Sequence, residues 1–379
     1  MLGRVRLSAN KLPKSKSPVR QAQYHDLNIT PKSKSPVLRL GPGGRSSTTG
    51  HVATVFGCTG FLGRYLVQKI ARTGAQVVVP YRDEMEKRHL KVMGDLGQIV
   101  PMEWDARRPD QIAECLRHSD VVYNLVGRDH ETKNFSYEDV HTKVASDIAS
   151  IATQEGIERL IHVSHFNAAH DSPSAFYRAK QAGEDLVREN FDGATIVRPS
   201  TMYGHEDRFL QQMAFWTIAY KLNNGQTRVK PAHVLDVAEA LHKMMTLDPG
   251  SEHLHSSLPG PKEYTYNEAI DVVSSLTLKE HKAPSVPKPI AKAVAQLMNR
   301  LLWWQSISED EVERRHLNDL AAIPEGHKSW NDLDIIPDYM EDVSIPYVRR
   351  YRTATTSNLP VERGGKPYKP PASQPQTNI

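Results

Sequence analysis

Cysteines, long apolar runs and acidic residues at the two ends are all scarce in this 379-residue sequence. Its two cysteines, Cys58 and Cys115, are too few for the disulfide framework of a small secreted scaffold. The apolar stretch from Phe209 to Tyr220 contains glutamines and ends well short of the roughly 20 residues of a membrane-spanning helix. We therefore expect no transmembrane helix. With 39% hydrophobic residues, the chain can still bury a substantial core.

The charge is divided unevenly along the chain. Residues 1–50 hold ten Lys and Arg and one acid, and residues 349–379 hold six and one. The stretch 51–348 holds 32 basic and 42 acidic residues, so the net charge of +4 combines an acidic body with two basic ends. A body of this sign predicts no nucleic-acid partner.

Both ends read as segments outside the main fold. Residues 1–47 are rich in Arg, Lys, Ser and Pro, a composition typical of a mitochondrial transit peptide with a flexible leader; a disordered basic tail is the alternative. The sequence Pro-Lys-Ser-Lys-Ser-Pro-Val occurs at 13–19 and again at 31–37, which we interpret as a local duplication in an unstructured leader. Residues 349–379, basic and rich in proline, are predicted to form an extended docking tail.

From His51 onward, short β-branched runs alternate with helical stretches. This alternation predicts an α/β fold, a doubly wound parallel sheet of the Rossmann type. We place the Rossmann domain at 48–250, with inserted segments of a smaller region from about 200, and the rest of that discontinuous C-terminal region at 251–348. The predicted strands are 52–56, 76–80, 99–102, 121–125, 160–163 and 195–197, and the clearest helices are 61–72, 137–154 and 175–189.

A glycine-rich motif follows the first predicted strand and opens the first helix. It reads Gly57-Cys-Thr-Gly60-Phe-Leu-Gly63-Arg64. Glycines let the backbone turn sharply and approach a pyrophosphate, and the N–H groups of the helix then bind it. The spacing G-x-x-G-x-x-G resembles that of the short-chain dehydrogenase/reductase superfamily. We expect a dinucleotide to bind here, at Gly57, Thr59, Gly60, Phe61, Leu62, Gly63 and Arg64.

The residues after the second strand indicate which dinucleotide. NAD sites usually place an acid there to bind the ribose 2′-hydroxyl, whereas this chain has Pro80, Tyr81 and then Arg82. Arg82 can bind a 2′-phosphate, and Arg64 would add a second charge, so NADPH is favoured. In the alternative, Arg82 is solvated and Asp83 binds the ribose.

Later strand ends extend the predicted cofactor site, because open sheets bind ligands at the carboxyl ends of their strands. Asp105 is expected at the adenine edge, and the segment after the fourth strand at the ribose and nicotinamide. The remaining assigned residues follow the fourth, fifth and sixth strands or lie on the helix after the fifth: Asn124, Val126, Gly127, Ser164, Lys180 and Pro199.

The position of the usual proton donor is altered. Reductases of this superfamily carry Tyr-x-x-x-Lys on one helix face, where the lysine binds ribose and lowers the tyrosine pKa. Here Phe176 lies four residues before Lys180, and Tyr177 lies about 100° round the helix. We therefore predict a bound nucleotide without turnover and no catalytic residue, unless a helix distortion lets Tyr177 serve. His162 and His165 should point to opposite faces of a strand, so no metal site is expected.

Taken together, the glycine motif, Arg128 to Phe135, His162-Val-Ser-His165, and Val197 to Gly204 followed by Glu206 to Phe209 resemble one family. It is the family of NADPH-carrying accessory subunits of mitochondrial complex I (NADH:ubiquinone oxidoreductase), atypical short-chain dehydrogenases. The resemblance implies a peripheral subunit on the matrix side of the inner membrane. It also implies contact with other complex I subunits near the junction of the two arms, and a role in assembly or stability but not in electron transfer.

The chain departs from that family at two points, and other functions remain open. Members often have Tyr where this chain has Phe176, and the usual Asn is not evident near His141. A soluble NADPH-dependent reductase or epimerase-like enzyme and an NADP(H)-sensing regulatory protein are the alternatives. Pro289 to Trp304 reads as an amphipathic helix for a membrane surface, a partner's groove or the protein's own core. The tail cluster around Arg350 would suit anionic lipid.

Overall fold

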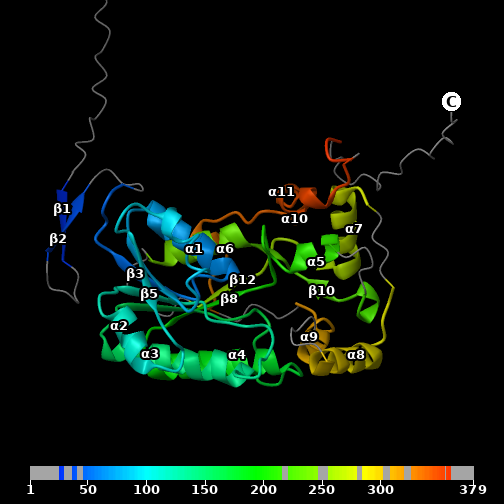
Figure 1. The fold of residues 1–379 in the computed structure, drawn as a ribbon, viewed down its shortest axis with the longest axis horizontal. Coiled ribbons are helices and arrows are strands. Elements are labelled where there is room, and N and C mark those ends of the chain that lie inside the picture. Colours follow the sequence, from blue (N-terminus) through cyan, green and yellow to red (C-terminus); the bar gives the residue numbers. More distant parts are fainter. Residues whose placement is uncertain are drawn as a thin grey trace, which may run out of the picture.

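The computed structural model describes residues 25–29, 36–40, 46–215, 221–245, 255–279, 284–301, 308–319, 326–354 and 356–359. Their main feature is a parallel sheet of seven strands in the order β12-β8-β7-β6-β3-β4-β5 (Figure 1). The strands are β3 (Val52–Phe56), β4 (Gln76–Tyr81), β5 (Ile99–Glu103), β6 (Val121–Asn124), β7 (Arg159–Val163), β8 (Thr195–Pro199) and β12 (Ser256–Leu258). All six predicted strands are confirmed within about two residues at each end, and the doubly wound α/β fold with them. The order reverses between β3 and β6, which is where such sheets bind ligands.

One face of the sheet is covered by α1 (Phe61–Arg72) and α6 (Val234–Met245), which pack against each other (Figure 1). Helix α1 buries Leu62, Leu66 and Ile70, which recur every four residues and so form one apolar stripe. This stripe packs on the valines of β3 and β4, and the resulting core fixes the helix start beside the glycine-rich motif.

The other face is covered by α2 (Pro109–Leu116), α3 (Val144–Gln154) and α4 (Ala175–Asn190) (Figure 1). Helix α3 begins directly after a π-helical turn at Asp139–Lys143, so the predicted helix 137–154 is two pieces of different pitch. Helix α4 is regular from end to end, and its Val187 is fully buried against α3 and β8.

A smaller region lies beyond the carboxyl ends of the strands. It consists of α5 (Phe209–Phe215), α7 (Tyr266–Thr277), α10 (Met340–Val343) and α11 (Ile345–Val348) around their own core. Two short pairs of strands belong to it, β10 (Arg228–Val229) with β13 (Tyr264–Thr265) and β9 (Met202–Tyr203) with β11 (Ala232–His233). Helix α7 starts at a capping box between Thr265 and Glu268. Helices α8 (Lys288–Leu301) and α9 (Glu309–Arg314) pack on each other beside it.

Late parts of the chain return to the large sheet. Strand β12 pairs with β8, and Trp330, Leu333 and Ile335 pack into the same core as α1 and α6. The domain boundaries given above stay a prediction.

Two further segments bear on the sequence interpretation. Within the predicted leader, β1 (His25–Ile29) and β2 (Pro36–Leu40) pair antiparallel, with Leu27 opposite Leu38, so these ten residues differ from the unstructured leader we expected. The aliphatic residues of these two segments favour strands. Each segment has only five residues, which is too short to show a helical period. Of the predicted helix 289–304, Trp303 and Trp304 lie outside the described residues. No described helix is long and apolar enough to cross a membrane.

Candidate functional site

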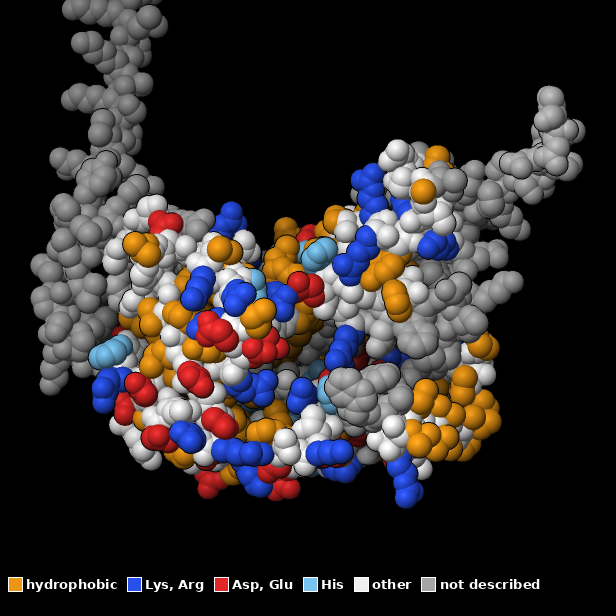
Figure 2. All heavy atoms as spheres, viewed as in Figure 1, with side chains coloured by type: hydrophobic (Ala, Val, Ile, Leu, Met, Phe, Trp, Pro, Cys, Tyr) orange, Lys and Arg blue, Asp and Glu red, His pale blue; other side chains and the backbone are white. Residues whose placement is uncertain are grey.

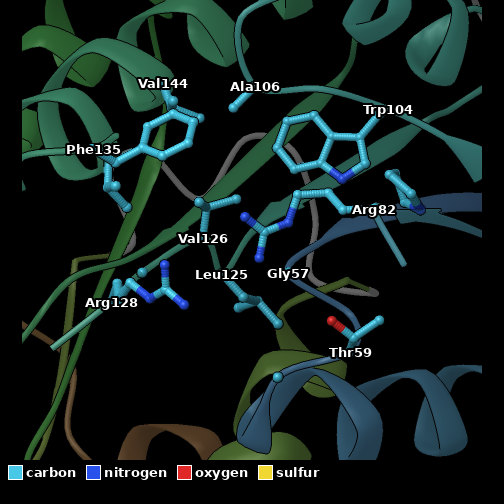
Figure 3. A pocket seen from close by; sticks show the side chains of 14 residues that line it. Gly57, Thr59, Arg82, Trp104, Ala106, Leu125, Val126, Arg128, Phe135 and Val144 are labelled. Carbon is cyan, nitrogen blue, oxygen red and sulfur yellow. The ribbon is translucent and has the colours of Figure 1, made fainter. Parts of the chain in front are cut away.

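A cleft of about 750 Å³ lies at the carboxyl edge of the sheet, between the Rossmann part and the smaller region. The cleft and the adjoining pocket in Figure 3 bring together twelve of the fifteen predicted site residues. These are Gly57, Thr59, Gly60, Phe61, Leu62, Gly63, Arg82, Val126, Gly127, Ser164, Lys180 and Pro199. The remaining three, Arg64, Asp105 and Asn124, are not among the lining residues.

The glycine-rich turn depends on close backbone approach. Gly57 has φ +80°, and a Cβ on it would lie 2.8 Å from the backbone of Leu125 on the neighbouring strand end. A Cβ on Gly63 would lie 2.7 Å from the Cα of Cys58. Gly60 directly precedes helix α1 and has no side chain to cap it, and the first turn of the helix contains no acid. The N–H groups of that turn are therefore free to bind an anion from the cleft.

The three residues outside the lining support the site's loops. Arg64 pairs with Glu206 and donates to the carbonyl of Thr59 at 3.0 Å, so it ties the glycine loop to the smaller region instead of facing a 2′-phosphate. Asp105 accepts from the backbone N–H of Arg107 at 2.9 Å. Asn124 is buried and accepts from the N–H of Val126 at 3.1 Å, which shapes the loop after β6.

Two arginines point into the pocket from opposite ends (Figure 3). Arg82 lies beside Trp104, and Arg128 lies nearer Phe135 and Val144. Both arginines are exposed, and neither guanidinium pairs with a side chain elsewhere in the described ranges. Trp104, 5% exposed and packed edge-on against Phe56, was not predicted as a site residue; its place directly after β5 is the signal that could have indicated it.

The corner around Lys180 is buried and short of hydrogen-bond partners. Lys180 Nζ donates to the carbonyl of Val163 at 3.1 Å, and burial lowers the pKa of this ammonium to about 8, while Glu184 opposes the shift. Ser164 Oγ is buried without a hydrogen-bond partner in the described structure. A buried hydroxyl normally has a hydrogen-bond partner, so the unpaired Ser164 at the cleft points to a polar ligand.

Phe176 lies in the cleft wall, four residues before Lys180, where the Tyr-x-x-x-Lys pattern of a reductase predicts the proton donor. Its ring packs against the rings of Tyr137 at 5.8 Å and His141 at 5.0 Å. Because α4 is regular throughout, the helix distortion that would put Tyr177 in this position does not occur. Burial raises the pKa of the Tyr177 hydroxyl, as does the nearby carboxylate of Asp319, so this group is a weak acid.

Helix α9 forms the far wall of the cleft. Asp310 accepts hydrogen bonds from Ser174 Oγ at 2.8 Å and from the N–H of Ala175 at 2.7 Å, and so caps α4. Arg314 pairs with Asp310 at 3.2 Å and donates to the carbonyl of Asp129 at 2.6 Å. The late segment of the chain thus fastens both the helix that carries Lys180 and the loop after β6.

His162 is buried and His165 is half-buried at the cleft wall, and desolvation lowers the pKa of each imidazole to about 3. Elsewhere, His233, Asp236 and Asp338 lie close enough to hold a metal ion. The two ring nitrogens of His233 are hydrogen-bonded to Asp338 at 3.2 Å and to the Tyr347 hydroxyl at 2.8 Å. These contacts tie β11 and the start of α6 to the segment that carries α10 and α11.

Comparisons with known proteins agree with the fold described above. Residues 53–255, more than half of the chain, match the model of the NAD dependent epimerase/dehydratase family. The chain is 44% identical to the mitochondrial NADH-ubiquinone oxidoreductase 40 kDa subunit of Neurospora crassa, over 88% of each chain. It is 40% identical to the NADH dehydrogenase [ubiquinone] 1 alpha subcomplex subunit 9 of Rattus norvegicus, over 84% of this chain and 85% of that one.

The chain belongs to this family of complex I subunits. Among solved structures, the NADP(H) complex of Citrobacter triphenylmethane reductase superposes with a TM-score of 0.60, over 78% of this chain and 99% of that one. The two are 14% identical, so this likeness shows the fold alone. The chain thus shares the fold of that reductase and matches the model of the NAD dependent epimerase/dehydratase family.

The residues present fit a dinucleotide. A side chain at Gly57 would collide with the backbone of Leu125, and one at Gly63 with the backbone of the turn itself. An uncapped helix start faces the cleft, and cationic side chains lie at both ends of the pocket. Ser164 and Lys180 offer polar atoms at the other half of the cleft. These features are those that pyrophosphate, ribose and phosphate groups require.

Proposed function

We propose that this chain is an accessory subunit of mitochondrial complex I that holds NADPH as a structural cofactor and does not transfer hydride from it. The observation that carries the proposal is Phe176, packed four residues before Lys180 in an otherwise complete dinucleotide cleft. When bound, NADPH supplies a reactive hydride, but no proton donor stands at the usual position beside Lys180. The bound molecule then serves to hold the loops of the cleft together.

Two measurements test this function. Native electrophoresis of solubilised mitochondria should find the chain in the band of complex I, and a free species of monomer size would contradict the subunit function. Denaturing the purified protein and identifying the released nucleotide by mass spectrometry should give NADPH or NADP⁺. Release of NADH, or of no nucleotide, would contradict the cofactor assignment and favour one of the other functions, an enzyme or a regulatory protein.

The choice of NADPH over NADH rests on Arg82. Loss of a charged hydrogen bond to the 2′-phosphate costs about 2 kcal/mol, so Arg82→Ala should weaken NADPH binding roughly 30-fold and leave NADH binding unchanged. Arg88→Ala is the matched control, because Arg88 is also an exposed arginine but does not line the cleft. Equal weakening of both nucleotides would assign Arg82 to a group that they share.

The chain docks on the matrix side of the inner membrane, at the junction of the peripheral and membrane arms, through α8. Its outer face exposes Ile290, Val294, Leu297, Met298 and Leu301, which form the largest apolar area in Figure 2, at the lower right. The opposite face is fixed by Ala295 and by the ion pairs of Lys288 and Lys292 with Glu313. An exposed apolar patch of this kind is typical of a subunit interface. The basic tail would lie near anionic lipid.

Variants of α8 test this docking. The double change Leu297→Glu and Leu301→Glu should leave the isolated protein folded, because both side chains are more than half exposed. It should reduce incorporation into complex I, measured as the share of the chain in the complex I band. Leu96→Glu, at a fully exposed leucine away from α8, is the control and should have no effect.

A further inference from the structure

His141 is held at the cleft by an unusual local structure. It lies on the π-helical turn Asp139–Lys143, whose wider pitch brings its backbone against α4. Gly183 makes this approach possible, because a Cβ at that position would collide with the His141 carbonyl. The imidazole is 2% exposed and is held between Tyr137, whose ring stacks on it at 6.1 Å, and Phe176.

The hydrogen bonds of His141 define its tautomer. Its Nε2 lies 2.8 Å from the carbonyl oxygen of Arg128, which can only accept, so Nε2 carries the proton. Nδ1 is therefore an acceptor, and it is buried without a partner in the described part of the chain. Burial holds the pKa of the imidazole well below its usual range, and the neighbouring Lys180 lowers it further, so the ring stays neutral.

Nδ1 lies at the half of the cleft away from Arg82 and Trp104. Gly127 marks its position, because a Cβ there would lie 4.0 Å from His141 Nδ1 and 3.5 Å from Lys180 Nζ. Both residues line the cleft, and so does Ser164 on the neighbouring strand end. The corner thus offers a donor, an acceptor and a hydroxyl over a glycine with no side chain. A ribose hydroxyl, which both accepts and donates, is matched to such a set.

We propose that His141 is a positioning residue of the cofactor site: its Nδ1 accepts a hydrogen bond from a hydroxyl of the nicotinamide ribose, while Lys180 donates to the same sugar. The inference rests on the proposed function, since it requires NADPH in the cleft. In this arrangement Phe176 also contributes to the cofactor site, because its ring packs edge-on against the imidazole of His141 and holds it in place.

Truncated ligands separate the two halves of the cofactor. NADPH has both halves, whereas 2′,5′-ADP keeps the phosphate-bearing adenosine and lacks the nicotinamide ribose. His141→Phe, which keeps a ring but removes the acceptor, should weaken NADPH about tenfold in titration calorimetry and leave 2′,5′-ADP unchanged. His141→Asn, whose amide oxygen can accept, should recover part of the loss. Arg82→Ala should weaken both ligands and serves as the reference.

Each outcome of this experiment bears on one of the two proposals. If the wild-type protein binds neither ligand, the cofactor assignment itself fails. If it binds both and His141→Phe weakens both equally, or neither, the assignment of His141 is overturned. Thermal unfolding of each variant shows that it is folded, and His141→Leu replaces the Phe variant if that protein does not fold.

Discussion

The guanidinium of Arg314 lies over the ring of Phe176, 4.6 Å from its centroid. A residue of α9, late in the chain, therefore covers the side chain that lies four residues before Lys180. The same arginine pairs with Asp310, which caps the helix that carries Phe176. Arg314 and Asp310 thus join α9 both to the ring of Phe176 and to the start of α4.

The cap that α9 places on α4 should be measurable as stability. Asp310→Ala removes the acceptor of two hydrogen bonds and the partner of Arg314, so the free energy of unfolding in urea should fall by roughly 1–3 kcal/mol. Glu309→Ala changes an adjacent, exposed acid and is the control. Equal losses in the two variants would mean that the effect comes from the charge of α9 and not from the cap.

Gly57 and Gly97 offer a matched pair for the glycine-rich turn, because both have φ +80°. Alanine at either position costs about 1 kcal/mol for the left-handed backbone. At Gly57 the added Cβ also meets Leu125 at 2.8 Å, whereas at Gly97 nothing lies within 4 Å. Gly57→Ala should therefore lower the melting temperature more than Gly97→Ala and should also reduce nucleotide retention. Comparable melting temperatures would show that the turn can relax.

A buried ion pair supports the helix of Lys180. Arg198 Nε and Nη2 donate to the two carboxylate oxygens of Glu184, at 2.8 and 2.6 Å, and Glu184 is fully buried. Arg198→Ala should destabilise the protein by about 3–5 kcal/mol in urea, because it leaves a buried carboxylate with only the longer contact to Arg188. Replacing both residues, Arg198→Met with Glu184→Leu, should recover much of that loss. No recovery would mean that the pair itself, and not the orphaned charge, carries the stability.

Asp319 predicts a pH dependence of stability. Burial raises the pKa of this carboxyl from 3.8 to about 6, so between about pH 4 and 6 the native state holds a proton that the unfolded chain has released. Stability contributed by this group is then present at acid pH and is lost as the pH rises to about 6. The difference in unfolding free energy between Asp319→Asn and the wild type should therefore shift in favour of the variant by roughly 3 kcal/mol from pH 4 to pH 7. Asp192→Asn, at an exposed aspartate, is the control, and a constant difference for Asp319→Asn would refute the prediction.

The sheet and the glycine-rich turn could be predicted because their signals are local. β-Branched runs followed by glycines indicate strands and turns without knowledge of the rest of the chain, and Phe176 could be compared with Lys180 by counting residues. The side-chain direction of Arg64 could not be predicted, because it depends on Glu206, 142 positions away. The contribution of α9 was missed for the same reason: Asp310 follows Ser174 by 136 residues.

Trp104 and His141 show two further limits. Trp104 is an apolar residue directly after a strand, which is equally typical of a core position, and only the pocket geometry distinguishes the two. His141 owes its position to a π-helical turn. Such a turn adds one residue to a helix, and the spacing of the apolar residues in the sequence does not reveal it. Nucleotide binding by these and the other assigned residues stays a prediction until it is measured.

The return of the late chain to the first core governs the order in which this protein can fold. The apolar cluster around β3 and α1 is completed by Trp330, Leu333 and Ile335, some 280 positions after β3 begins. Such distant closure is slow, because a long loop must be ordered before its contacts form. A chain emerging from a ribosome or an import channel exposes the side of α1 and α6 that these residues cover until position 335 has passed. A premature stop after residue 300 should therefore yield a less stable chain, because Trp330, Leu333 and Ile335 would be missing from this core.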